Sequence, residues 1–181
     1  IVREVMEVNY FGLVSLTGKL LPQLIRYRGR ILINGSMAGR IALPFLGPYA
    51  ASKFALEGYA DSLRREMRPF GVQVTLLETA GVATPIWNKA KKMKPADYPA
   101  VYRKSLRLFM RNFIEDGNRG MDQRAAAQRI FDILVSKRIK PRYIIAKSVI
   151  VSRLESRIPD RLFDRICVRL FGMDYGGTAK H

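Results

Sequence analysis

The residues best suited to acid–base chemistry are Tyr49 and Lys53, four positions apart in the segment G-P-Y-A-A-S-K-F. In a helix, residues i and i+4 lie on one face, one turn apart. A free tyrosine has a pKa of about 10 and is a weak base at neutral pH, but a neighbouring ammonium group favours its phenolate form. The spacing therefore predicts that Tyr49 exchanges a proton with a hydroxyl or carbonyl oxygen of a bound molecule.

The same spacing recurs at Tyr143 and Lys147, but in a segment with strand character. Two residues four apart in a strand are roughly 13 Å from one another. A lysine at that distance does little to a tyrosine, so this second pair is not expected to act together.

Ser36 follows a short apolar run and opens a loop rich in Gly and Pro. Loops that follow buried strands present polar groups to ligands, so the Ser36 hydroxyl could hold the reacting oxygen. Taken singly, each candidate also has an ordinary interpretation. Ser36 is typical of a turn, Asn9 of a helix, and Tyr49 with Lys53 of a surface helix pair.

The elements that must position these residues follow from hydrophobic periodicity and from Gly and Pro breaks. The pattern predicts helices over 1–27, 49–68 and 122–136, the last capped by Asp122, and strands over 30–34, 72–77 and 142–146. Residues 35–48 are expected to form a loop, 79–120 an irregular lid with short helices, and the tail two helices broken at Pro159. Alternating helices and buried strands indicate an α/β fold with a parallel sheet.

The segments N-Y-F-G (9–12), G-R-I-L-I-N-G-S-M-A-G-R (29–40) and G-P-Y-A-A-S-K-F-A-L-E-G (47–58) together resemble the short-chain dehydrogenase/reductase (SDR) family. Asn9 precedes Ser36 by 27 residues and Ser36 precedes Tyr49 by 13, as in that family. The likeness is greatest to bacterial members whose lid begins with Pro-Ile-Trp, here Pro85 to Trp87. It implies a Rossmann-type, doubly wound parallel sheet.

The resemblance implies a role for each matched residue. Tyr49 would be the general acid/base and would also contact the cofactor, and Lys53 would tune Tyr49 and bind the nicotinamide ribose of NAD or NADP. Ser36 would position the substrate oxygen, and Asn9 would anchor a water in a proton relay. Val82 would meet the nicotinamide carboxamide through its backbone, Thr84 would help to hold the cofactor, and Trp87 would contact substrate.

Some family features are absent from the sequence. The glycine-rich phosphate turn, the residue that selects NAD or NADP and the Asn-Ala-Gly strand do not occur, and the family's Pro-Gly aligns with Thr79-Ala80. The chain is therefore expected to be a partial SDR domain that lacks the N-terminal nucleotide-binding half. Within it, 1–78 form the catalytic core, 79–121 the substrate lid, 122–147 the last helix and strand, and 148–181 a basic amphipathic tail.

The expected function is interconversion of a secondary alcohol and a carbonyl, on a lipophilic substrate. The lid aromatics fit either an apolar pocket or a lid core; they are Trp87, Tyr98, Tyr102, Phe109 and Phe113. The family likeness also implies a homo-oligomer formed through helices 1–27 and 49–68. The alternative is a truncated, non-catalytic chain that acts as a binding or membrane-surface module.

The net charge of +17 lies mostly in the second half, where residues 89–181 carry 22 basic and 9 acidic side chains. A basic field can attract nucleic acid, an anionic membrane or an acidic ligand, or can simply be solvated. No nucleic-acid motif supports a specific nucleic-acid partner. The amphipathic segment 160–171 fits either a membrane surface or packing within the protein, and packing is slightly favoured.

One cysteine and one histidine, Cys167 and His181, leave no internal disulfide and no cluster with metal-ligand spacing. The sequence therefore predicts no metal. It also contains no run of 18 apolar residues, so a cytoplasmic protein, membrane-associated at most, is expected.

Overall fold

A computed structural model of the chain describes residues 1–90 and 93–173. Its sheet has three parallel strands in the order β1-β2-β3: β1 Arg30–Asn34, β2 Gln73–Thr79 and β3 Arg142–Ile145. β2 is central, with Ile33 opposite Leu76 on one side and Tyr143 opposite Leu77 on the other. The expected parallel α/β architecture is confirmed.

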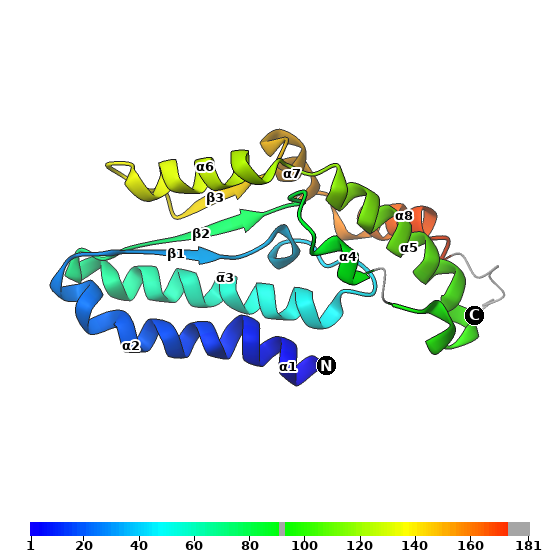
Figure 1. Ribbon diagram of the computed structural model, residues 1–181, viewed down its shortest axis with the longest axis horizontal. Helices are drawn as coiled ribbons and strands as arrows, with labels where there is room; N and C mark the ends of the chain where they lie inside the picture. The colour runs from blue at the N-terminus through cyan, green and yellow to red at the C-terminus, as the bar shows by residue number, and fades with distance from the viewer. Residues whose placement is uncertain (91–92, 174–181) are drawn as a thin grey trace.

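The first helical layer contains α1 Val2–Met6, a π-helical turn Glu7–Phe11 and α2 Gly12–Arg26, which form one continuous rod as predicted for 1–27. It lies beside α3, Gly47–Met67, on the same side of the sheet (Figure 1). Pro48 in the first turn explains why α3 begins two residues before the predicted start, because its fixed φ suits that turn. The shared core of this layer contains Ile33, Leu56, Leu63, Val74 and Leu76.

The other side of the sheet is covered by α6, Gln123–Val135 (Figure 1). Asp122 caps α6 as predicted, since its carboxylate accepts the backbone N–H groups of Arg124 and Ala125. Ile133 and Ala126 of α6 pack with Leu77 and Ile145 of the strands. The sheet therefore has helices on both faces, as a doubly wound fold requires.

The lid departs from the prediction of short helices alone. α4, Trp87–Ala90, is short, but α5 runs for 19 residues, Ala100–Asn118. Its apolar residues Tyr102, Leu106, Phe109 and Phe113 do recur at helical spacing, but the prolines before the helix and the glycines at its end gave the segment an irregular pattern. The helix is held by tertiary packing of Leu106 and Phe109 against Cys167 and Phe171.

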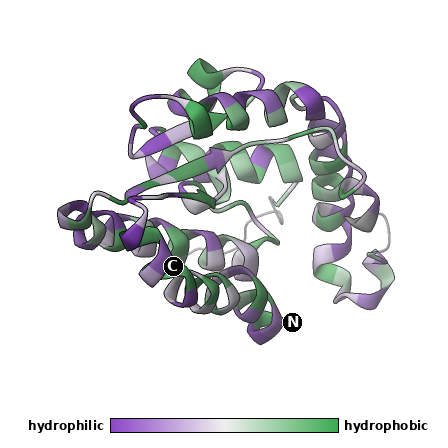
Figure 2. Cartoon of the chain, turned by 60° about the vertical axis from the view of Figure 1, so that its left-hand side comes forward, coloured by the Kyte–Doolittle hydropathy of each residue, from purple (hydrophilic) through white to green (hydrophobic). Residues whose placement is uncertain are grey.

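The tail forms α7, Val149–Glu155, and α8, Asp160–Phe171, separated at Pro159 as predicted. Hydrophobic and hydrophilic residues alternate along the helices, as expected where one face packs and the other meets solvent (Figure 2). In the described residues, no helix is long and apolar enough to cross a bilayer.

Candidate active site

Tyr49 and Lys53 lie one turn apart near the start of α3, and the Lys53 Nζ is 5.6 Å from the centre of the Tyr49 ring. The same Nζ donates a hydrogen bond of 3.0 Å to the backbone carbonyl of Asn34, at the end of β1. Burial lowers the pKa of Lys53, since removal from water penalises the ammonium form. The lysine is thus anchored beside the phenol in a partly desolvated position.

Ser36 is buried just beyond β1, where its hydroxyl oxygen accepts the N–H of Ala38 at 3.1 Å and caps a turn at Met37–Gly39. This contact uses the oxygen as an acceptor, so the hydroxyl hydrogen can still be donated to a ligand. Gly39 brings the loop against α3: a Cβ there would lie 2.8 Å from the Lys53 carbonyl oxygen. The turn therefore fixes Ser36 close to the helix that carries Tyr49 and Lys53.

Asn9 reaches α3 through a residue that the sequence did not single out, Ser52. The Asn9 Nδ2 donates to the Ser52 Oγ at 3.0 Å, and Ser52 donates to the Tyr49 carbonyl at 2.7 Å. Ser52 is 0% exposed. Asn9 sits in the π-helical turn, a distortion that often occurs at functional sites. Asn9 lies 43 residues before Ser52 in the sequence, so no local pattern predicts this contact.

Asn34 is a second residue that sequence analysis missed. Besides its carbonyl contact with Lys53, its side-chain oxygen accepts a hydrogen bond of 3.1 Å from the Thr79 hydroxyl. Thr79 ends β2, so this bond joins the carboxyl ends of two adjacent parallel strands. Ligands of open α/β sheets bind beyond such ends.

Val82 and Thr84 follow β2 in an extended segment that pairs with Met121. The Ala83 N–H donates to the Met121 carbonyl at 2.9 Å, and the Met121 N–H donates to the Gly81 carbonyl at 2.8 Å. Gly120 permits this approach, because a Cβ there would lie 2.2 Å from the Gly81 carbonyl oxygen. Hydrogen bonds to Met121 at the end of the lid therefore hold the backbone that follows β2 in place.

Trp87 points into the lid. Its indole N–H donates to the Val82 carbonyl at 2.7 Å, and its ring meets Phe113 edge to face at 5.0 Å. Phe109 is buried in the cluster that α5 shares with α8, and it stacks on Phe113. These contacts favour a lid core for the three aromatics, while Tyr98 and Tyr102 remain partly exposed.

A buried charge network begins one turn beyond Lys53. The Glu57 carboxylate accepts a hydrogen bond of 3.0 Å from the Nε of Arg142, which starts β3. Arg142 also lies 3.5 Å from Glu78 of β2 and 3.0 Å from Asp61 of α3. Burial raises the pKa of Glu57, against the opposing effect of Arg142. The network ties α3 to the sheet behind the site.

Two further sequence expectations concern residues outside this group. Tyr143 lies in β3 and accepts the Lys140 N–H, while Lys147 contacts the Arg119 carbonyl, so that pair has separate partners. Among the described residues, no group of three or more His, Cys, Asp or Glu side chains could hold a metal ion. His181 lies outside the described residues.

A parallel α/β sheet with helices on both faces defines a Rossmann-like protein, and the candidate Ser, Tyr and Lys group lies beyond its strand ends. The short chain dehydrogenase family matches residues 1–95, and the chain belongs to that family.

Several relatives agree with this assignment. The chain is 34% identical over 175 residues to an NADPH-dependent 3-dehydrocapnine reductase of Ornithobacterium rhinotracheale, covering 91% of the chain and 60% of the relative. It is 42% identical over 110 residues to the mitochondrial D-beta-hydroxybutyrate dehydrogenase of Mus musculus, covering 56% of the chain and 32% of that enzyme. The chain therefore spans about three fifths of the length of the 3-dehydrocapnine reductase, 60%, and less of the second enzyme.

Solved structures share the fold. A short-chain dehydrogenase from Burkholderia cenocepacia in complex with NADP aligns with a TM-score of 0.65 at 20% identity, over 94% of this chain and 59% of that chain. A short chain dehydrogenase/reductase from Burkholderia phymatum in complex with NAD aligns with a TM-score of 0.67 at 20% identity, over 89% and 58%.

Proposed function

We propose that this chain carries the catalytic part of an NAD(P)-dependent oxidoreductase that interconverts a secondary alcohol and a carbonyl. The observation that carries the proposal is the position of the Lys53 Nζ, which is 5.6 Å from the Tyr49 ring and anchored to the carbonyl of Asn34. Family membership supports it, as do the NADP and NAD complexes of the structural neighbours.

The donors of this chain fit the nicotinamide end of such a cofactor. Lys53 offers an ammonium group at the strand ends, and the backbone at Val82 offers amide groups. The sequence contains no glycine-rich turn for the pyrophosphate, so the chain supplies one end of the site. We propose that it corresponds to the C-terminal part of the domain, with Pro85 to Trp87 at the start of the lid.

In the proposed mechanism, a nicotinamide cofactor held at Lys53 and at the backbone of Val82 would supply the hydride-transfer chemistry. The Ser36 hydroxyl donates to the substrate oxygen and orients it. Tyr49 gives a proton to that oxygen in the reduction and takes it back in the oxidation, assisted by Lys53. Asn9 and Ser52 hold the first turn of α3, which keeps the Tyr49 backbone in place.

Apolar side chains that remain exposed on the lid, Ile86, Tyr98 and Tyr102, support a lipophilic alcohol or ketone as substrate. Exposed apolar side chains on α1, α2 and the adjoining turn support a homo-oligomer formed through 1–27 and 49–68; they include Val2, Val8, Phe11, Leu16 and Leu20. We also propose that the tail makes peripheral contact with a membrane. The structure describes the tail through α7 and α8, and these two helices would form the contact.

The test uses protein expressed from the complete reading frame that encodes this chain. NADH and NADPH binding is measured by fluorescence titration, followed by turnover of lipophilic ketones. Tyr49→Phe should lower kcat by about 100-fold or more while nucleotide affinity stays the same, because only the proton donor is removed. A Tyr49→Phe enzyme with wild-type kcat would exclude the proposed role. Absence of both nucleotide binding and turnover would instead favour the non-catalytic binding module.

A further inference from the structure

The outer side of α7 combines exposed aliphatic side chains with cations. Ile150, Val151 and Leu154 are 74%, 52% and 62% exposed. Positions i and i+4 of a helix share a face, so Ile150 and Leu154 lie together, with Val151 beside them. Exposed cations border this apolar cluster; they are Lys147, Arg153 and Arg157. Clustered exposed aliphatic residues with a polar rim mark an interaction surface.

Helix α8 also carries exposed cations next to exposed aliphatic side chains. Arg161, Arg165 and Arg169 form an i, i+4, i+8 row and are all exposed. The adjacent row contains Leu162 and Leu170, which are both about half exposed, with Ile166 between them. Cys167 and Phe171, by contrast, pack against α5. Packing thus accounts for one side of α8, as the sequence favoured, and leaves the arginine row and an apolar row outside.

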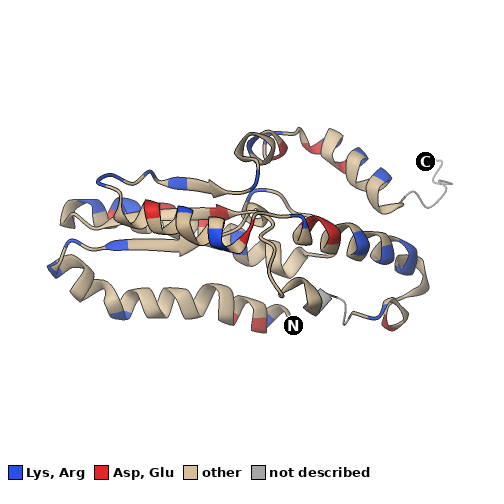
Figure 3. Cartoon of the chain, turned by 45° about the horizontal axis from the view of Figure 1, so that its top comes forward, with Lys and Arg blue, Asp and Glu red and all other residues tan. Residues whose placement is uncertain are grey.

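The acidic residues of the two helices face elsewhere. Glu155, Asp160 and Asp164 line a cavity of about 300 Å³ together with Arg40 and Ile41 of the loop after β1. These three acidic side chains are exposed and lie beside the loop after β1, whereas the arginine row of α8 carries only cations. In Figure 3, Lys and Arg lie along α5 and α8 at one end of the molecule, and Asp and Glu also lie on these helices.

We propose that this α7–α8 surface docks on an anionic lipid bilayer. The exposed aliphatic side chains would enter the headgroup region, and the six cations, Lys147, Arg153, Arg157, Arg161, Arg165 and Arg169, would contact lipid phosphates. Arginine suits this position because its aliphatic stem can lie along apolar surface while its charge stays at the headgroups.

Charge and chemistry distinguish this occupant from two others. A second copy of the same surface would set six cations against six like charges, which is unfavourable. A nucleic acid would pair with the cations, but it gains binding from aromatic stacking and phosphate contacts, and the exposed apolar residues here are aliphatic. An anionic bilayer offers phosphates that bind the cations and an apolar interior that accepts the aliphatic side chains.

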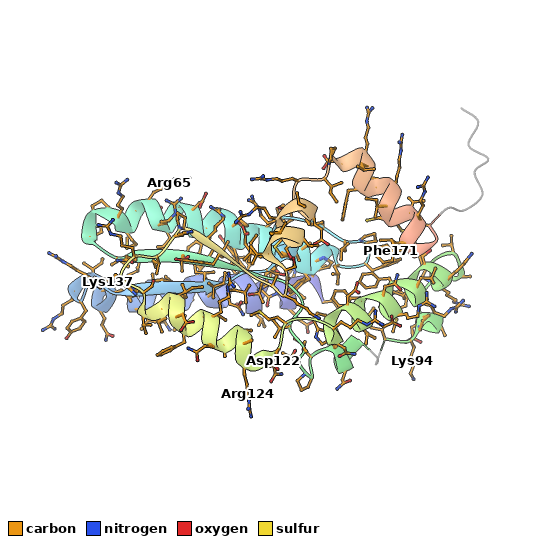
Figure 4. All side chains as sticks on the ribbon, turned by 90° about the horizontal axis from the view of Figure 1, so that it is seen from above. Arg65, Lys94, Asp122, Arg124, Lys137 and Phe171 are labelled. Atoms are coloured by element: carbon orange, nitrogen blue, oxygen red, sulfur yellow. The ribbon has the colours of Figure 1, made fainter. Side chains whose placement is uncertain are left out.

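The experiment is co-sedimentation of protein expressed from the complete reading frame that encodes this chain with vesicles of phosphatidylcholine alone or mixed with phosphatidylglycerol. We expect binding to the mixed vesicles that weakens with salt. The triple variant Arg161→Gln, Arg165→Gln, Arg169→Gln should bind on the order of 100-fold more weakly, at about fivefold per cation. The matched control removes the same charge from the α6 region by Arg124→Gln, Arg129→Gln, Lys137→Gln. Figure 4 places Arg124 on the side of the molecule away from α8.

A second variant separates insertion from charge. Ile150→Ser with Leu154→Ser leaves the charge unchanged and should lower vesicle affinity about tenfold or more, since two aliphatic side chains no longer leave water. Equal binding to neutral and mixed vesicles would overturn the proposal. So would equal losses in the α8 and α6 triple variants, or a DNA duplex that displaces the chain from vesicles through the α8 arginines. Unchanged thermal unfolding of each variant shows that the losses come from the surface.

Discussion

Ser52 illustrates how one small buried side chain can join two elements of the candidate site. It accepts from Asn9 and donates to the Tyr49 carbonyl, and thereby joins the π-helical turn before α2 to the first turn of α3. Its complete burial means that no water can replace these bonds. The position of the Tyr49 backbone therefore depends on a residue three positions further along the helix.

Ser52→Ala should lower the free energy of unfolding by about 1–3 kcal/mol, because it leaves the Asn9 amide without its buried acceptor. The comparison variant is Ser62→Ala on the same helix, where the hydroxyl makes an exposed bond to Glu66. That change should cost about 0.5 kcal/mol or less. Urea unfolding of both variants measures the difference, and equal losses would contradict the proposed role of Ser52.

At the scale of elements, the lid is held to the sheet by close backbone contacts. Gly117 of α5 lies against the Trp87 ring, and a Cβ there would be 2.2 Å from the indole. Gly120 lies against the Gly81 carbonyl in a similar way. The start of α4, the end of α5 and the segment after β2 therefore form one packed unit, in which the indole N–H holds the Val82 carbonyl.

Gly117→Ala should destabilise the protein by about 1–3 kcal/mol, because the indole must move to accept the added methyl group. It should also change the fluorescence of Trp87, the only tryptophan in the chain. Gly58→Ala in α3 is the control, since a Cβ there meets nothing within 4 Å. That change should stabilise by roughly 0.5–1 kcal/mol, as alanine favours helix. Thermal unfolding would contradict this account if both variants shifted in the same direction.

The charge network that links α3 to β2 and β3 predicts a pH effect. Burial raises the pKa of Glu57 above its usual value of about 4.5, so folding favours its protonated form. Its contribution to stability is therefore present at pH values below the usual pKa and is lost as the pH rises through the raised value. The pKa of Asp61 shifts in the opposite direction. Desolvation alone would raise this pKa, but the contacts with arginine side chains outweigh it, so the pKa of Asp61 is lowered.

In the unaltered chain, ionisation of Glu57 should lower the free energy of unfolding as the pH rises from about 4.5 toward neutrality. Glu57→Gln cannot ionise, so its free energy of unfolding should fall less over this range. Asp61→Asn should instead remove stability that is present above about 3.8, and lost in acid as the pH falls through the lowered pKa. Urea midpoints across this pH range test both. A Glu57→Gln curve parallel to that of the unaltered chain would show that Glu57 does not titrate in this way.

At the scale of the whole molecule, hydrophobic surface remains on the side of α1 and α2 that faces away from the sheet. Within the described residues, β1 pairs only with β2, so its other edge is also unpaired. An unpaired edge of a parallel sheet invites further strands or other chains. Both features support the homo-oligomer proposed above.

Leu16→Glu should shift the chain toward monomer, because Leu16 is 59% exposed on the helix proposed to meet a second copy and two such charges would oppose each other. Light scattering at several concentrations measures the change in mass. Lys19→Glu, on the same helix, tests whether charge alone has this effect. An unchanged mass for Leu16→Glu would place the subunit contact elsewhere.

Much of the fold was accessible from sequence because the informative patterns are local. The boundaries of β1 match the predicted strand 30–34, the Asp122 cap is correct, and the i, i+4 spacing of Tyr49 and Lys53 brings them together on α3. The long helix α5 was missed because the prolines and glycines of 79–120 indicated an irregular segment, although the apolar face that packs against α8 has helical spacing.

Contacts between distant residues required the tertiary structure. The bond from Asn9 to Ser52 spans 43 residues, and the bond from Arg142 to Glu57 spans 85. Backbone geometry fixes which residues share a helix face, so the i, i+4 spacing within a predicted helix specifies the Tyr49–Lys53 pair. Which strand ends and helices then meet depends on how the hydrophobic faces pack, and that packing alone brought Asn34, Ser52 and Thr79 into the site and turned Trp87 toward the lid core.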